Sequence, residues 1–386
     1  MSGQSGRPNR GHGGATAAFE FILDNSLLLI AGALAALVWV NVNAPGYGRV
    51  SASLRFAVND IAMVFFFGLA TKEVVEAMLP GGPLSSVREG ALPIFAAVGG
   101  MAAPAGIYLL SIRALGMPEI HSGWAIPCAT DIAFSYLAAR LIFPRGSPAI
   151  PFLLLLAIAD DALGLLVLAV FYPSGALSPV MLGALLVPGM VLAWTMRRYG
   201  VENFWAYVCG PGVLSWLGLF YGGLHPALAL VPIIPLMPHH KSDLRLFGRA
   251  ATVRLFTLKQ FADWWRAPVQ FVLLGFGLVN AGVPLTAVGP VTWIVLASLV
   301  IGKPIGIVAT SLLAEQFGFR RAAGLDLRTL VTLGMAAGIG FTVALFFAAA
   351  AFAPSPVLDQ AKMGALLSFS AAFVAIAAGR VLGIKR

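Results

Sequence analysis

Two adjacent carboxylates, Asp160 and Asp161, lie in an apolar run from Pro151 to Phe171 that contains no other charged residue. A helix of this length crosses the roughly 30 Å hydrocarbon layer of a bilayer. Each ionised Asp at the centre of such a helix costs roughly 2.5–3.5 kcal/mol on insertion scales, and two neighbours also repel each other. We therefore expect the pair to bind ions, the alternative being a structural pair satisfied by neighbouring helices.

Other charged residues are expected at the same depth. Glu73, Asp131 and Lys303 lie inside apolar segments, and Asp60 lies near the end of one. Intramembrane ionisable groups pair with each other and mark ion or proton routes. Asp131, Asp160 and Asp161 have a single basic residue, Lys303, at their depth. At least one of the three carboxylates therefore remains free for a cation or a proton. Consecutive residues project about 100° apart on a helix, so one member of the adjacent pair should face Lys303 and the other a water-filled cavity.

The chain that must position these residues is a polytopic membrane protein by composition. Of 386 residues, 59% are hydrophobic and 11% are charged, whereas soluble proteins carry about 25% charged residues. The sequence predicts an all-α fold in a single integral membrane domain over residues 1–386, with residues 1–16 as a disordered cytoplasmic tail. About twelve transmembrane helices are expected, at residues 20–41, 57–79, 91–112, 122–143, 149–172, 177–196, 203–219, 222–237, 260–285, 287–314, 328–352 and 361–383.

Two of these segments contain residues that interrupt helices. In the fourth, Pro127 removes a helical hydrogen bond and clashes with the preceding turn, just before Thr130 and Asp131. The eleventh contains Gly338 and Gly340, for which close helix packing is the other interpretation. Interrupted segments at corresponding positions in two halves indicate a transporter binding site.

The two breaks predict an internal repeat and a local electrostatic arrangement. They correspond if segments 3–5 and 10–12, at about 91–172 and 287–384, are inverted repeats, with the remaining helices forming a separate panel. Half-helix ends bring partial charges to the middle of the membrane. We expect Asp131 to offset the positive ends and Lys303 the negative ends.

Basic residues fall mostly into alternate connections. Arg88 lies in the second, Arg140 and Arg145 in the fourth, and Arg197 and Arg198 in the sixth. The positive-inside rule then places both termini in the cytoplasm, which requires an even number of spans. The net charge of +9 therefore reflects topology, and no nucleic-acid partner is expected. The lipid bilayer is the expected partner.

The chain resembles the bacterial NhaA-type sodium/proton antiporters over nearly its whole length. The resemblance is carried by Gly123–Pro127, Ala129–Phe134, Ala159–Asp161, Asn280–Val283, Gly302–Pro304 and Gly338–Thr342. It implies inverted repeats with two broken helices, residence in the bacterial inner membrane, and no cofactor beyond the transported ions. It also suggests a homodimer, although the connection between the first two segments, at about Asn43 to Leu54, is short for the dimer-forming hairpin of the family.

The resemblance also implies roles for single residues. Asp161 matches the main cation-binding carboxylate, Asp160 its neighbour, and Lys303 the lysine that pairs with that neighbour. Thr130 and Asp131 match the extended part of the fourth helix. Positions matching a pH response are Glu73, Asp60 and His225, with a looser match at Asp263.

We therefore expect a secondary transporter, not an enzyme, that exchanges Na⁺ or Li⁺ for protons. Asp161, Asp160 and Thr130 would supply oxygen ligands for the cation, and the exchange of two protons per Na⁺ would make the cycle electrogenic. A sodium-coupled symporter of related fold is the nearest alternative. A pH sensor that does not transport is another. An intramembrane aspartyl protease, which needs its two Asp on separate helices, fits poorly.

Overall fold

The computed structural model describes residues 26–144, 146–238, 257–319, 321 and 324–384. The predicted tail at 1–16 lies outside these ranges. Every regular element in the described part is helical, as predicted. The α-helices are α2 (Leu27–Val42), α3 (Ala44–Phe56), α4 (Met63–Met78), α5 (Val87–Ala114), α6 (Ile132–Ile142), α7 (Ala149–Phe171), α8 (Pro179–Arg198), α9 (Phe204–Tyr207), α10 (Val213–Gly222), α11 (Thr257–Asn280), α12 (Pro290–Ala297), α13 (Lys303–Gln316), α14 (Leu327–Ala337), α15 (Phe341–Ala351), α16 (Pro356–Leu367) and α17 (Ser370–Val381).

Shorter helical elements join several of these helices. Three are π-helical, namely η1 (Ala57–Ala62), η3 (Val208–Gly212) and η6 (Ser298–Gly302). Three are 3₁₀ helices, namely η2 (Pro118–Cys128), η4 (Pro226–Leu228) and η5 (Ile234–Leu236). Because π-helices widen a helix locally and often occur at functional sites, the π-turn directly before Lys303 is of interest.

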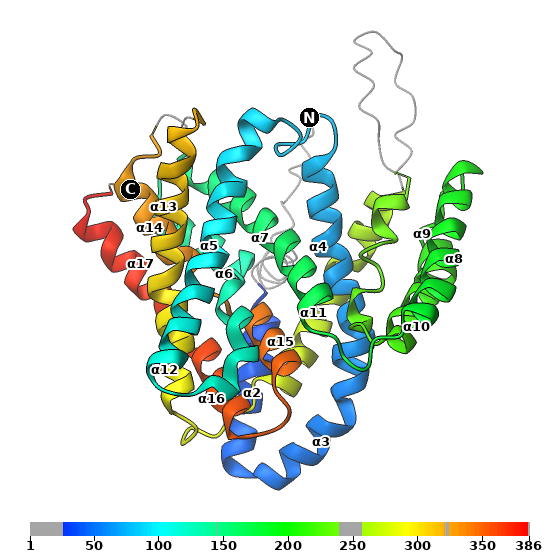
Figure 1. The fold of residues 1–386 in the computed structure, drawn as a ribbon, viewed down its shortest axis with the longest axis horizontal. Coiled ribbons are helices and arrows are strands. Elements are labelled where there is room, and N and C mark those ends of the chain that lie inside the picture. The colour runs from blue at the N-terminus through cyan, green and yellow to red at the C-terminus, as the bar shows by residue number, and fades with distance from the viewer. Residues whose placement is uncertain (1–25, 145, 239–256, 320, 322–323, 385–386) are drawn as a thin grey trace, which may run out of the picture.

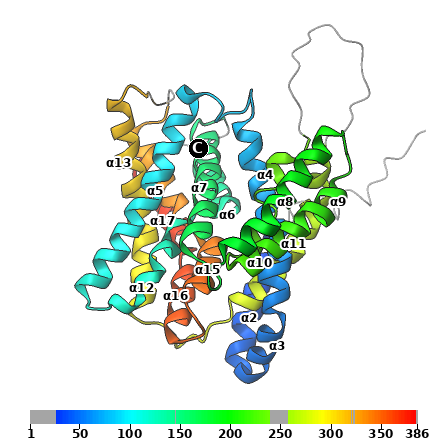
Figure 2. The same cartoon turned by 45° about the vertical axis from the view of Figure 1, so that its right-hand side comes forward.

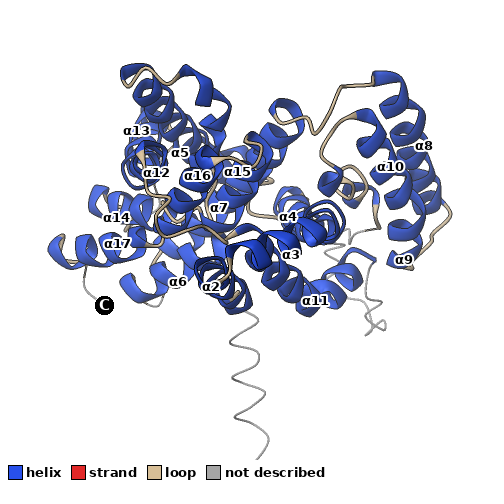
Figure 3. Cartoon of the chain, turned by 90° about the horizontal axis from the view of Figure 1, so that it is seen from below, coloured by secondary structure: helices blue, strands red, loops and turns tan. Residues whose placement is uncertain are grey.

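The helices form two groups (Figure 1). The first, here called the core group, contains α5, η2, α6, α7 and α12 to α17. The second, here called the panel group, contains α2 to α4 and α8 to α11. Figure 2 and Figure 3 show α8, α9 and α10 as a separate layer, with α4 and α11 between that layer and the core group.

Six helices in the described part are long and apolar enough to cross a bilayer alone, and eight such spans result if each of two bent helix pairs counts as one. The six are Gly90–Ala114, Ala149–Phe171, Pro179–Arg198, Phe204–Gly222, Pro290–Gln316 and Pro356–Val381. The apolar helix α2 has only 16 residues. The protein is therefore a multi-pass membrane protein, and the number of about twelve spans stays a prediction.

The bent pairs are the two segments that the sequence predicted to be broken. The axes of η2 and α6 differ by 55°, and those of α14 and α15 by 51°. One feature was not predicted: the half before the first break, which ends one residue after Pro127, is 3₁₀ rather than α-helical. Each bent pair follows one long helical segment and precedes another, which agrees with the proposed order of the repeats without establishing their symmetry.

Two stretches differ from the prediction. Of the predicted segment 222–237, Gly222 ends α10 and the rest forms turns and two three-residue 3₁₀ helices rather than one transmembrane helix. Pro226, Pro232 and Pro235 lack the amide hydrogens that a continuous helix needs. The expected connection at 43–54 is instead the helix α3. The Asn43 side chain accepts a hydrogen bond from the Gly46 amide at 2.9 Å and so caps α3.

Close approach of α13 to α5 fixes the height of Lys303 in the core group. Gly302 lies directly before Lys303, and a Cβ atom at that position would lie 2.7 Å from the Cα atom of Pro104 on α5. Only glycine permits this approach. Lys303 therefore begins α13 while fully buried, with 0% of its surface exposed.

Candidate cation site at the crossing of two broken helices

The two helix breaks contact each other inside the core group. The Asp131 amide, just before α6, donates a hydrogen bond to the Ile339 carbonyl between α14 and α15, at 2.7 Å. Gly340 makes this crossing possible, because a Cβ atom there would lie 2.8 Å from the Ala129 carbonyl oxygen. This hydrogen bond joins the two breaks. It also satisfies backbone groups that have no partner within their own half-helices.

The Asp131 carboxylate lies at the N-terminal ends of two half-helices. Its Oδ1 accepts a hydrogen bond from the Phe134 amide of α6 at 3.5 Å, and its Oδ2 accepts one from the Thr342 amide of α15 at 3.2 Å. The Thr342 hydroxyl also donates to Oδ2. An anion at a helix N-terminus is stabilised by the helix dipole. This position agrees with the charge balance expected of Asp131.

The Lys303 ammonium group reaches the C-terminal end of one half-helix, α14, through Thr130. It donates to Asp160 Oδ2 at 2.8 Å and to Thr130 Oγ1 at 2.5 Å. The Thr130 hydroxyl in turn donates to the carbonyl of Ala337 at 3.2 Å, at the C-terminal end of α14. A cation near a helix C-terminus is favourable. The expected contact between Lys303 and Asp160 is therefore present.

The two adjacent aspartates have different surroundings. Asp160 is 1% exposed, and its Oδ1 atom is buried without a hydrogen-bond partner. Asp161 is partly exposed and lines two cavities. In the described part of the chain it makes no hydrogen bond or ion pair. One carboxylate thus faces the lysine and the other a cavity, as the 100° spacing on a helix predicts.

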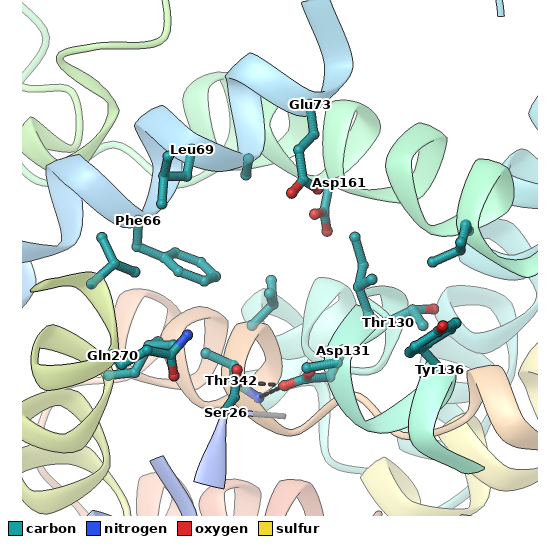
Figure 4. Close-up of a pocket in the computed structure, with 17 residues that line it drawn as sticks. Ser26, Phe66, Leu69, Glu73, Thr130, Asp131, Tyr136, Asp161, Gln270 and Thr342 are labelled. Atoms are coloured by element: carbon teal, nitrogen blue, oxygen red, sulfur yellow. Dashed lines mark hydrogen bonds between the residues drawn. The ribbon is translucent and has the colours of Figure 1, made fainter. Parts of the chain in front are cut away.

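The larger of the two cavities has a volume of about 280 Å³ and is lined by residues of α4, α6, α7, α11 and α15. Figure 4 shows Asp161 and Glu73 pointing toward one another on its upper wall, with Thr130 nearby and Asp131 and Thr342 below. The neighbouring residue Lys72 forms its ion pair with Glu76, at 2.7 Å, and not with Glu73. The Glu73 side chain lines the cavity.

The smaller cavity, on the other side of Asp161, is apolar. Its volume is about 20 Å³, and four of its lining residues are Phe66, Phe67, Phe346 and Phe347. The Phe67 and Phe346 rings contact each other edge to face, with 4.9 Å between centroids. Aromatic side chains therefore close this side of the site.

Asp60 and His225 lie together beyond these aromatic residues. His225 Nδ1 is 3.8 Å from Asp60 Oδ1, too far for a hydrogen bond. The His225 ring lies against Phe346, with 4.8 Å between centroids. Asp60 lies inside η1 rather than at a helix end, and its backbone carbonyl accepts a hydrogen bond from Trp216 Nε1 at 2.8 Å.

For two further residues, the prediction and the structure differ. Asp263 is exposed on α11 and does not line either cavity around Asp161. Gln270, which lines the larger cavity from α11, was not predicted from the sequence. A neutral side chain on an apolar helix gives little energetic signal, so no pattern marked it. Among the described residues, no three His, Cys, Asp or Glu side chains group as a metal site.

Comparison with known proteins identifies the family. The profile of the family described as Na⁺/H⁺ antiporter 1 matches residues 21–380. A protein named Na(+)/H(+) antiporter NhaA 2 from Pelobacter propionicus is 43% identical over 94% of this chain and 97% of its own length. A Na(+)/H(+) antiporter NhaA from Geotalea uraniireducens is 45% identical over 94% of this chain and 96% of its own.

Among solved structures, the sodium proton antiporter MjNhaP1 from Methanocaldococcus jannaschii has a TM-score of 0.49 at 14% identity, covering 96% of this chain and 99% of that one. A likeness this distant adds nothing to the family assignment. The assignment follows from the matching profile and from relatives that align along nearly their whole length. This chain belongs to the Na⁺/H⁺ antiporter 1 family.

Proposed function

We propose that this chain is a secondary transporter that exchanges Na⁺ for H⁺ by competition of the two ions for Asp161. One observation carries the proposal. Asp161 reaches the cavity without a hydrogen bond or ion pair from the described residues, whereas Asp131 and Asp160 are both engaged. A carboxylate with open oxygens inside a membrane protein is suited to bind a cation or a proton.

Oxygen ligands for the cation are available beside Asp161. The unpartnered Oδ1 atom of Asp160 is one, and the second lone pair of the Thr130 hydroxyl is another. Hard cations such as Na⁺ and Li⁺ prefer oxygen ligands. The family name supports Na⁺, and we extend the proposal to Li⁺ because the same ligands suit both ions.

Competition couples the two flows. Na⁺ entering the site displaces the proton from Asp161. When Asp160 turns an oxygen to the cation, its contact with Lys303 weakens, and the lysine releases a second proton. Two protons then move for each Na⁺, so that each cycle moves one net charge. The buried contact of Lys303 with Asp160 and Thr130 supports this second proton site.

Alternating access would come from movement of the core group against the panel group. The larger cavity lies toward the end of α4 that carries Glu73. The connection after α4 is on the cytoplasmic side by the positive-inside rule, which also puts both termini there, in the bacterial inner membrane. The pH response is a separate part of the proposal. We assign it to Glu73, Asp60 and His225, with the exposed Asp263 as a fourth candidate.

The homodimer stays a prediction.

The test is Asp161→Asn in everted membrane vesicles that contain a pH-sensitive dye. Asparagine keeps the size of the side chain but cannot bind a proton in exchange for Na⁺. We expect Na⁺-dependent proton movement to fall to the level of vesicles without the protein. Glu119→Gln, which neutralises an exposed carboxylate outside both cavities, is the control and should keep the activity. Wild-type proton movement in the Asp161 variant would overturn the proposal.

A further inference from the structure

The cavity in front of Asp161 is lined by a polar side chain that nothing in the sequence singled out. Gln270 lines this cavity from α11. Its Oε1 atom is buried and has no hydrogen-bond partner among the described residues. We propose that the Gln270 amide oxygen is a sodium-selective ligand that raises the affinity for Na⁺ on the cavity side and takes no part in proton binding. This inference rests on the proposed exchange of Na⁺ for H⁺.

An amide oxygen without a hydrogen-bond partner is available to a ligand, and rotation about the last torsion of the Gln270 side chain can turn it to the cavity. Leaving a buried acceptor without a partner costs free energy comparable to a lost hydrogen bond. The α11 residues beside it in the lining, Val269 and Leu273, are apolar and offer no side-chain donor. Figure 4 shows Gln270 on the wall of the cavity opposite Asp161, near Thr342. A hydrated or partly dehydrated cation in the cavity would supply the missing partner.

The chemistry of an amide separates the two competing ions. The titratable side chains that line this cavity are Glu73, Asp131, Tyr136 and Asp161. Of their carboxylates, Asp131 is engaged by hydrogen bonds, whereas Glu73 and Asp161 can bind either a proton or a cation. The amide of Gln270 is neutral and stays unprotonated at physiological pH, but its carbonyl oxygen is a good ligand for a hard cation. Gln270 therefore favours Na⁺ over H⁺ in their competition.

The position of Gln270 limits this preference for Na⁺ to one side of the membrane. Gln270 belongs to α11 in the panel group, which packs against α2 and α4, whereas Asp161 belongs to α7 in the core group. If the two groups move against each other during transport, Gln270 shares a cavity with Asp161 only in the state seen here. The amide then raises affinity for Na⁺ arriving from this side and has little effect on the other.

The experiment measures the apparent KM for Na⁺ as a function of pH in Gln270→Met, which keeps the length of the side chain and removes the amide. In everted vesicles, we expect KM to rise about fivefold at every pH, as for one lost polar interaction. The curve of KM against pH should move upward without moving along the pH axis. The maximal rate should stay within about twofold of wild type, and so should KM measured in right-side-out vesicles.

Two further variants sharpen the result. Gln270→Glu adds a proton-binding group, so its curve should also shift along the pH axis. Gln316→Met makes the same chemical change at an exposed position at the end of α13, outside the cavity lining, and should match wild type.

An unchanged KM in Gln270→Met, or an equal rise on both sides of the membrane, would overturn this inference while leaving exchange at Asp161 in place. A curve displaced along the pH axis in Gln270→Met would also contradict it. Wild-type vesicles without Na⁺-dependent proton movement would instead contradict the proposed function itself.

Discussion

At the residue scale, the two adjacent aspartates have different roles, because Asp160 contacts Lys303 while Asp161 faces the cavity. The cost of a charge in the membrane marks Asp160, Asp161 and Lys303 in the sequence, and the 100° step between neighbours assigns them different partners. Gln270 carries no such cost, so its place in the cavity appears only in the structure. Asp60 and His225 are far apart in the chain, so their closeness could be seen only in the three-dimensional fold.

The buried contact between Lys303 and Asp160 predicts a strongly unequal effect of single and double substitutions. Lys303→Met leaves the Asp160 carboxylate, which is 1% exposed, without its cationic partner. Breaking a buried pair from one side typically costs about 3–5 kcal/mol. The melting temperature of the purified protein in detergent should therefore fall clearly.

In the double variant Asp160→Asn with Lys303→Met, neither position of the pair keeps a buried charge without its partner. The melting temperature should recover most of the loss, because neutral replacement of both partners is often nearly neutral in stability. Glu76→Gln, which breaks the exposed pair with Lys72, should shift it little. Equal losses in the single and double variants would argue against a stabilising contact.

At the element scale, helix breaks were predictable where proline and glycine act on the backbone, but their form was not. Pro127, Gly338 and Gly340 mark both breaks correctly. The π-turns η1, η3 and η6 have no comparable signal, since they depend on packing between helices. Residues 43–54, which contain Pro45, were expected to be a connection between two segments, but most of them belong to the helix α3. Proline is well tolerated in the first turn of a helix, so Pro45 does not prevent α3 from forming.

The crossing of the breaks predicts that Gly340→Ala is damaging. The added Cβ would lie 2.8 Å from the Ala129 carbonyl oxygen and 3.0 Å from Leu299 Cδ2, so the two breaks must move apart. We expect a loss of about 1–3 kcal/mol in stability, together with a lower transport rate. Gly106→Ala on α5, where no atom lies within 4 Å, is the control and should be tolerated. Equal behaviour of the two variants in melting and vesicle assays would contradict the close crossing.

At the scale of the whole molecule, the division into core and panel groups depends on contacts between segments that are distant in sequence. The core group packs α13 along α5, while the panel group packs α11 along α2. Apolar composition predicts that such helices cross a membrane but not which of them pair, because lipid and helix surfaces are equally apolar. Close-packed glycines, such as Gly302 against Pro104, decide the pairing.

The exchange of two protons for one Na⁺ predicts a response to membrane potential. One net charge moving through 100 mV is worth about 2.3 kcal/mol, so the Na⁺ gradient at which net flux stops should shift about 50-fold. The measurement uses proteoliposomes with an imposed potassium diffusion potential and a range of Na⁺ gradients. A null point that does not move with the potential would indicate one proton per Na⁺.

The small apolar cavity behind Asp161 has a bioenergetic consequence. A volume of about 20 Å³ holds roughly one water molecule. A single water between phenylalanine rings does not form a continuous chain along which protons hop. In this state the small cavity therefore gives a proton on Asp161 no chain of waters along which to leave. A cell carrying this protein in its energised membrane would keep its proton-motive force when Na⁺ is scarce, because exchange stops without opening a leak.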